Sequence, residues 1–157
     1  MTNMKRRIFL KGALASGAVA VAVGAGLLTP RAVLAAWPES AFGAKNMADA
    51  LAALLPGMTP EESADIAIKA PPIAENGAVV PVEVSTGIAG VESISIFAEG
   101  NNTPLTSRWI LGPGAEPFVS TRLKMAKTSN VTVVVVAGGK AYQAQKEVKV
   151  TIGGCGG

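Results

Sequence analysis

The chain contains one cysteine, Cys155, and the two residues on each side of it are glycines. A thiol can act as a nucleophile or hold a covalently attached group once it is ionised, and an unperturbed cysteine has a pKa of about 8.5. Glycines add no side chain to a core and lose more conformational freedom on ordering than other residues. We therefore expect an exposed thiol on a flexible arm made by Gly153, Gly154, Gly156 and Gly157.

The length of the arm determines how far the thiol can reach. An extended chain spans ~3.3–3.6 Å per residue, so the segment from Ile152 to Cys155 can project the sulfur roughly 10 Å beyond the last expected strand. Such an arm could enter a narrow pocket of another protein. We interpret Cys155 as a covalent carrier whose thiol holds a small group while other enzymes act on it. Two alternatives remain open: a disordered tail, and an unpaired cysteine that forms an intermolecular disulfide.

The rest of the sequence offers little catalytic chemistry. It has no histidine, which excludes Ser-His-Asp and Cys-His catalytic arrangements and most zinc sites. Four basic residues could form a cationic surface beside an anionic substrate or an acidic partner, although solvated strand faces are the simpler interpretation: Arg108, Arg122, Lys124 and Lys127. The chain is therefore expected to be a substrate carrier without cofactor or metal, and not an enzyme.

The N-terminus has the composition of an export signal. Arg6 and Arg7 stand in a basic cluster, which an uncharged stretch rich in Ala, Gly and Val follows. This stretch is too weakly hydrophobic to be a good permanent membrane span. Val33 and Ala35 supply small residues at signal-peptidase spacing. We predict a twin-arginine signal over residues 1–35, a mature protein in the periplasm without membrane attachment, and a partner exported together with it, since this route carries folded cargo.

Removal of the signal changes the sign of the charge. Residues 1–35 hold five of the 14 Lys and Arg and none of the 11 Asp and Glu, so nine basic and 11 acidic residues remain, a net charge of −2. A mildly acidic protein gives no indication of nucleic-acid binding. About 122 of the 157 residues remain, enough for one domain with one core, and a single cysteine excludes an internal disulfide.

The mature chain begins with two helix signals. Residues 40–55 carry apolar side chains at helical spacing before a Pro-Gly pair, which predicts one amphipathic helix. Thr59, Pro60 and Glu62 form a capping box, which predicts a second helix of one or two turns.

From residue 65 onward, short β-branched runs alternate with turn residues. They predict strands over 65–69, 79–85, 91–98, 105–110, 118–126, 130–137 and 142–152. Val119 and Leu123 should face the core, the nearly all-valine run 131–136 should be central, and Gly138-Gly139 should form a tight hairpin. Pro81 predicts that its strand lies at an edge or carries a bulge.

This order of elements predicts a mainly β fold. We expect an immunoglobulin-like antiparallel β-sandwich with an N-terminal helical segment over residues 36–152, followed by the carrier arm over 153–157.

Two segments resemble the SoxY family of sulfur carriers in thiosulfate oxidation. Residues 148–157 read VKVTIGGCGG, and residues 70–82 read APPIAENGAVVPV. The resemblance covers the mature chain and implies a periplasmic heterodimer with a SoxZ-like subunit. It also implies that a haem-containing enzyme attaches thiosulfate to Cys155 as an S-thiosulfonate. A hydrolase then releases sulfate and leaves a persulfide. A sulfur dehydrogenase oxidises this persulfide where the system has one, and a further hydrolysis regenerates the thiol.

Two other functions fit parts of the sequence. A ubiquitin-like sulfur carrier would also end in Gly156-Gly157, but it would use the terminal carboxylate in the cytoplasm, so the export signal and Cys155 both disfavour it. The main alternative is an exported β-sandwich binding module that dimerises through a Cys155 disulfide.

Overall fold

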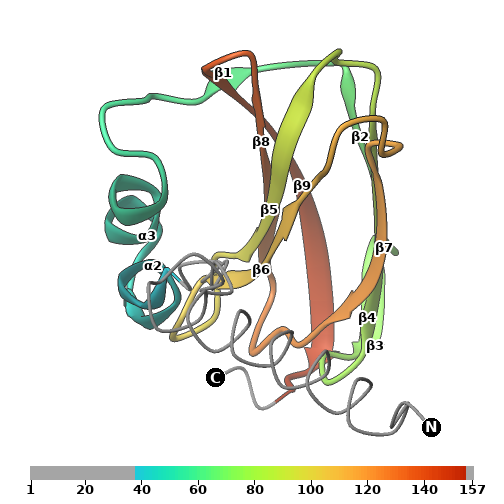
Figure 1. The fold of residues 1–157 in the computed structure, drawn as a ribbon. Coiled ribbons are helices and arrows are strands. Elements are labelled where there is room, and N and C mark those ends of the chain that lie inside the picture. Colours follow the sequence, from blue (N-terminus) through green and yellow to red (C-terminus); the bar gives the residue numbers. More distant parts are fainter. Residues whose placement is uncertain (1–37, 155–157) are drawn as a thin grey trace, which may run out of the picture. The chain divides into compact units, whose positions relative to one another are not determined.

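Residues 38–154 are described by a computed structural model, drawn in Figure 1. Residues 1–37, which contain the predicted signal, and residues 155–157, which include Cys155, lie outside this range. Within it, two helices precede nine strands. The helices are α2 (Glu39–Gly43) and α3 (Met47–Leu54), and the strands are β1 (Glu61–Glu62), β2 (Ile66–Lys69), β3 (Ile73–Asn76), β4 (Val80–Thr86), β5 (Val91–Ala98), β6 (Leu105–Ile110), β7 (Phe118–Leu123), β8 (Ser129–Ala137) and β9 (Lys140–Ile152).

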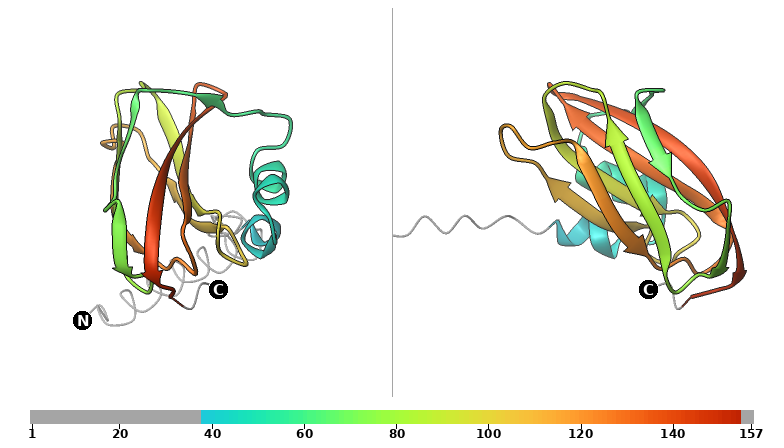
Figure 2. Two further views of the ribbon diagram at one scale, coloured as in Figure 1. Left: turned by 180° about the vertical axis from the view of Figure 1, so that it is seen from behind. Right: turned by 90° about the vertical axis from the view of Figure 1, so that its right-hand side faces the viewer.

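The strands form two sheets that pack face to face (Figures 1 and 2). The larger sheet has the order β1-β9-β8-β5-β6, and β3 pairs with the far end of β9. The smaller sheet has the order β2-β4-β7. The predicted mainly β sandwich with an N-terminal helical segment is therefore confirmed. Its strand pairs are antiparallel except that β1 and β3 run parallel to β9.

The sheets pack through strands that have one apolar face. Along β7, buried Val119 and Leu123 alternate with exposed Ser120 and Arg122, as predicted for such a strand. Each fully buried aliphatic side chain stabilises the fold by about 1.5–3 kcal/mol relative to exposure. The fully buried members of the core between the sheets include Val80, Val82, Val84, Ile94, Ile96, Met125, Val131, Val133, Val135 and Val148.

β8 is buried on both faces because the helices cover the other side of the larger sheet. Val131 and Val133 belong to the core between the sheets, whereas Val134 and Val136 pack in a second cluster with Leu54 of α3. Figure 1 shows the helices on one side of the larger sheet and the smaller sheet on the other. The valine run therefore marks the middle layer, and its predicted central position, between β5 and β9, is confirmed.

The helical segment is divided into two helices, so the single helix predicted over residues 40–55 is wrong. α2 ends at Gly43, and α3 begins after Asn46, whose Oδ1 accepts a hydrogen bond from the Asp49 amide at 2.9 Å. Asn46 Nδ2 also donates to the Asp49 carboxylate at 2.8 Å. An asparagine N-cap with an acid three residues later starts a new helix inside the apolar periodicity.

The short helix predicted from residue 59 is also wrong. Glu61 and Glu62 form β1, which runs parallel to β9 at Tyr142 and Gln143. Gln143 Nε2 donates to Glu62 at 2.8 Å, and the Gln143 carbonyl accepts from the Ser63 amide at 2.9 Å. A one-turn helix fixes several residues for a single hydrogen bond. The open edge of β9 offers this segment more partners.

Pro81 does not mark an edge strand or a bulge, because β4 is the middle strand of the smaller sheet and its ladders are regular. β2 pairs only with Glu83 and the residues after it, so Pro81 lies past the end of β2 and pairs with Arg122 of β7 alone. Proline lacks an N–H, and this stretch of β4 has only one neighbour. The hairpin predicted at Gly138-Gly139 is confirmed, with φ of 57° and 73°.

Candidate functional site

The predicted arm begins at the end of β9. Ile152 is the last residue of the strand, Gly153 and Gly154 follow it, and residues 155–157 with the cysteine lie outside the described range. Beyond Val148, β9 leaves β8 and pairs with β3. β3 is not among the seven predicted strands, because its four residues show no regular alternation of apolar and polar side chains.

Three backbone segments meet at this end of β9 and are joined by hydrogen bonds. The Gly77 amide donates to the Ile152 carbonyl at 2.8 Å, and the Gly154 amide donates to the Met125 carbonyl at 2.9 Å. The Met125 amide donates to the Gly77 carbonyl at 2.7 Å and closes the set. We call this arrangement, formed by residues 76–78, 124–126 and 152–154, the arm socket. It holds the chain as far as Gly154.

The socket requires glycine because its backbones approach too closely for a side chain. A Cβ on Gly154 would lie 2.5 Å from the amide nitrogen of Ala78, and one on Gly77 would lie 2.7 Å from the amide nitrogen of Gly154. A Cβ on Gly153 would overlap the carbonyl oxygen of Ala126. Unstrained contacts between carbon atoms are about 3.5–4.0 Å. None of the three glycines has a positive φ, so space and not backbone conformation requires them.

This packing gives the first two glycines a role beyond the predicted flexibility. Gly153 and Gly154 contact the sandwich closely, so the described chain is held against it as far as Gly154 and not only as far as Ile152. Adjacent Cα atoms are 3.8 Å apart. The predicted reach of roughly 10 Å is counted from Ile152 and includes Gly153 and Gly154, which are held; the reach of the thiol past Gly154 stays a prediction. Flexibility of residues 155–157 stays a prediction.

Asn101 supports the socket and is not among the predicted site residues. It follows β5, and its Nδ2 donates to the Lys124 carbonyl at 2.7 Å while its Oδ1 accepts from the Ala126 amide at 2.9 Å. These two bonds hold the backbone on both sides of Met125, which binds Gly154. In the sequence, Asn101 stands in an ordinary turn signal. Nothing in that signal connects it with residues 23 and 25 positions later.

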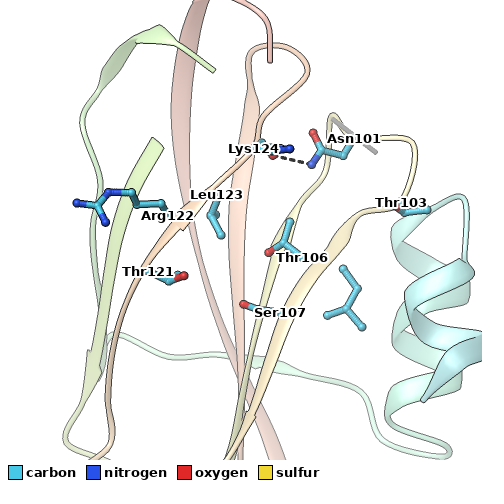
Figure 3. A pocket seen from close by; sticks show the side chains of 9 residues that line it. Asn101, Thr103, Thr106, Ser107, Thr121, Arg122, Leu123 and Lys124 are labelled. Carbon is cyan, nitrogen blue, oxygen red and sulfur yellow. Dashed lines mark hydrogen bonds between the residues drawn. The ribbon is translucent and has the colours of Figure 1, made fainter. Parts of the chain in front are cut away.

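The four basic residues considered above do not form one surface. Arg108 lines a pocket beside Leu54 and Ile110, next to α3. Arg122 and Lys124 line a groove of about 320 Å³ between the edge strands β6 and β7, but the Arg122 side chain points away from it (Figure 3). The polar side chains that line the groove are mostly hydroxyls and one amide: Asn101, Thr103, Thr106, Ser107 and Thr121. Lys127 is exposed and lines neither the pocket nor the groove, so the four side chains form no shared cationic site.

The hydrogen bonds that form the socket join backbone amides to backbone carbonyls. Within residues 38–154, no three His, Cys, Asp or Glu side chains lie together in a group that could hold a metal ion. In the same range, no helix has the length and apolar character needed to cross a membrane.

Comparison with known proteins finds a family model whose match includes Cys155. The family model described as sulfur oxidation protein SoxY matches residues 51–155. A search among curated proteins found no match. A solved superoxide reductase (neelaredoxin) from Ignicoccus hospitalis is 27% identical over 54% of this chain and 78% of its own, but its TM-score of 0.49 is too low to indicate a shared fold.

A second solved structure is much more similar. The sulfur carrier protein SoxY from Chlorobium limicola f thiosulfatophilum is 52% identical, over 67% of this chain and 96% of its own, with a TM-score of 0.62. The resemblance carried by residues 70–82 and 148–157 is confirmed by both findings. The chain therefore belongs to the SoxY family of sulfur carriers in sulfur oxidation.

Proposed function

We propose that Cys155 is the covalent attachment point for sulfur intermediates of thiosulfate oxidation. The observation that supports this most directly is the family match, which runs through the socket segments and includes Cys155. Gly154 is held by the sandwich, and the cysteine is the next residue in the sequence. A thiol at the end of a strand, with a glycine on each side, can enter a pocket that a bulkier segment could not.

The proposed cycle uses the thiol and no other group of this chain. A haem-containing partner accepts an electron pair while the Cys155 sulfur bonds to the sulfane sulfur of thiosulfate and the thiol proton is released. A hydrolase then cleaves the bond to the sulfone with water, which releases sulfate and a proton and leaves a persulfide. A sulfur dehydrogenase oxidises the outer sulfur with oxygen from water and accepts the electrons. A second hydrolysis releases the oxidised outer sulfur as sulfate with a proton and returns the thiol, so the chain is a carrier and not a catalyst.

We also propose that a SoxZ-like subunit binds the free edge of β6. Among the described strands, β6 pairs only with β5. On β6, Ser107 Oγ and Arg108 Nε are buried without a hydrogen-bond partner within the described chain. The next two residues, Trp109 and Ile110, are 43% and 70% exposed. A partner that adds a strand to this edge would pair the unpaired backbone groups of β6. It would also bond the two unsatisfied polar atoms and cover the exposed apolar side chains.

The proposed location is the periplasm, after export by the twin-arginine route. The support lies in the sequence, where Arg6 and Arg7 precede a weakly apolar stretch and small residues end at Ala35. A carrier that assembles with a second subunit before export would suit a route for folded proteins.

Intact mass spectrometry of the mature protein tests the carrier function. The protein is isolated from its host during growth on thiosulfate and measured with and without a thiol reductant. We expect a reductant-sensitive mass addition that matches thiosulfonate or sulfane sulfur and that a Cys155→Ser variant lacks. An unmodified thiol, or disulfide dimers alone, while thiosulfate is being consumed would instead support an exported binding module that dimerises through Cys155.

A further inference from the structure

The sandwich holds the arm up to the residue before the cysteine. Ile152 accepts a hydrogen bond from Gly77 and Gly154 donates one to Met125, so the backbone is bonded on both sides of Gly153. An arm that pivoted at the end of β9 would have neither the second bond nor the close packing around it. The described chain therefore offers no pivot before Gly154.

The walls of the socket are fixed in turn. Met125 is fully buried in the core, so the carbonyl that binds Gly154 cannot move far without opening the sandwich. Asn101 bonds the backbone before and after Met125 at 2.7 and 2.9 Å. On the opposite wall, the Ala78 amide is bonded to Asn76 Oδ1 at 2.8 Å. Both walls are thus held by contacts that do not involve the arm.

The close fit distinguishes the socket glycines from glycines in ordinary turns. Gly87 and Gly112 have no atom within 4 Å of an added Cβ. Gly77 and Gly154 would meet each other's backbone or that of Ala78 at 2.5–2.7 Å. A glycine kept only for flexibility needs open space around it, and these two have none.

We propose, resting on the carrier function proposed above, that Gly77, Asn101 and Met125 are positioning residues for the reactions at Cys155. They fix the point at which the arm leaves the body, so the thiol searches a small volume when a partner enzyme binds. Restricting a reacting group in this way raises its effective concentration at the partner's active site and reduces the entropy lost on binding. Because the arm leaves the body at one fixed point, each partner enzyme meets the thiol at the same place.

Two matched sets of variants of the full mature chain test the proposal. Gly77→Ala puts a methyl group into the socket, and Gly87→Ala is its control because Gly87 has open space and no positive φ. Asn101→Ala removes both side-chain hydrogen bonds. Asn101→Asp keeps the acceptor for the Ala126 amide and should recover part of the effect.

The first measurement is hydrogen exchange of the Gly154 amide by NMR. We expect protection in the unmodified chain and in Gly87→Ala, and exchange roughly two- to tenfold faster in Gly77→Ala and Asn101→Ala, the effect of about one hydrogen bond. Amides of β8 should keep their rates. The second measurement is thiosulfate loading with purified partner enzymes. Here KM for the carrier should rise by a similar factor while kcat stays unchanged.

Several results would overturn the proposal. One is a Gly154 amide that already exchanges freely in the unmodified chain. The proposal also fails if the exchange rate of the Gly154 amide and KM both stay at the control values in Gly77→Ala and in Asn101→Ala. If Gly77→Ala does not fold, the comparison of Asn101→Ala with Asn101→Asp tests the proposal by itself. An unmodified thiol that never takes up sulfur would contradict the carrier function, whereas the Gly154 exchange rate reports on the socket independently of sulfur chemistry.

Discussion

At the residue scale, position 154 shows how backbone packing can dictate a residue type. Its amide is bonded to Met125, and a side chain there would meet the backbone of Ala78, which cannot rotate away as the end of a long side chain can. Of the two segments that would clash, the end of the arm can move more easily than the backbone of the sandwich. A larger residue at 154 is therefore expected to release the arm from the socket and leave the sandwich in place.

Gly154→Val should lower the free energy of unfolding by about 0.5–1.5 kcal/mol, since release of the arm loses one hydrogen bond. Urea denaturation of the mature protein measures this difference. Gly156→Val is the matched control, and we expect it to change stability by less than about 0.5 kcal/mol because we propose that the arm is free beyond Gly154. Equal destabilisation by the two variants would contradict a boundary at this residue.

The sequence predicts the thiol but not the socket, for a physical reason. Cys155 and its glycines stand together in the chain, and their composition alone indicates an exposed carrier. Gly77, Asn101 and Met125 are far apart in sequence, and each belongs to an ordinary turn or strand pattern. Only the measured approach of three backbones shows that Gly77 and Gly154 are glycines because of space.

At the element scale, a strand is predictable where its own residues carry the pattern. β7 shows strict alternation, and β8 shows a valine run covered on both faces. β1 and β3 have four residues or fewer and are strands only because β9 lies beside them. Their side-chain bonds to β9 join residues 76 to 81 positions apart, as between Glu62 and Gln143. No local pattern can report such a partner.

The break between α2 and α3 gives a direct test at this scale. Asn46→Ala removes the side-chain acceptor for the Asp49 amide, and loss of such an N-cap destabilises proteins by about 0.5–2 kcal/mol. Thermal or urea unfolding should show this loss, and Asn46→Ser, which keeps a capping oxygen, should recover most of it. Equal stability of the alanine and serine variants would mean that α3 does not depend on this cap.

At the scale of the whole molecule, the helices cover one face of the larger sheet, and β6 is a free edge of that sheet. Trp109 and Ile110 stand exposed there beside the unsatisfied Ser107 and Arg108. Partly exposed aromatic residues at an interface often dominate binding energy. We propose this free edge as the binding site of the second subunit, because its exposed and unsatisfied groups lie on one strand.

Trp109→Ala is expected to weaken binding of the partner subunit by roughly 30-fold or more, the effect of a loss of about 2 kcal/mol at an interface hot spot. Titration calorimetry with the purified subunit measures the change. Phe118→Ala removes an aromatic side chain that is also exposed, at 49%, but lies on β7 of the smaller sheet, so it should leave affinity unchanged. The reverse ranking would move the interface to the smaller sheet.

Export provides a second test of the whole molecule. Replacing Arg6 and Arg7 together by lysine keeps the charge of the signal but removes the arginine pair, and we expect the precursor to accumulate in the cytoplasm. Fractionation of cells followed by detection of the mature chain measures this. Lys11→Arg is a control that should be exported normally. Normal periplasmic yield of the double lysine variant would show that another route is used.

The double burial of β8 has a consequence for the time before the fold is complete. Residues 131–136 are uncharged and mostly β-branched, a composition typical of segments that stack into fibrils when they are exposed. In the folded chain, β5 and β9 pair with both edges of this strand, and two apolar layers cover its faces. Sheets closed by non-local contacts fold slowly, on a scale of milliseconds to seconds. We therefore expect irreversible aggregation mainly during that interval, when a chaperone would have its largest effect.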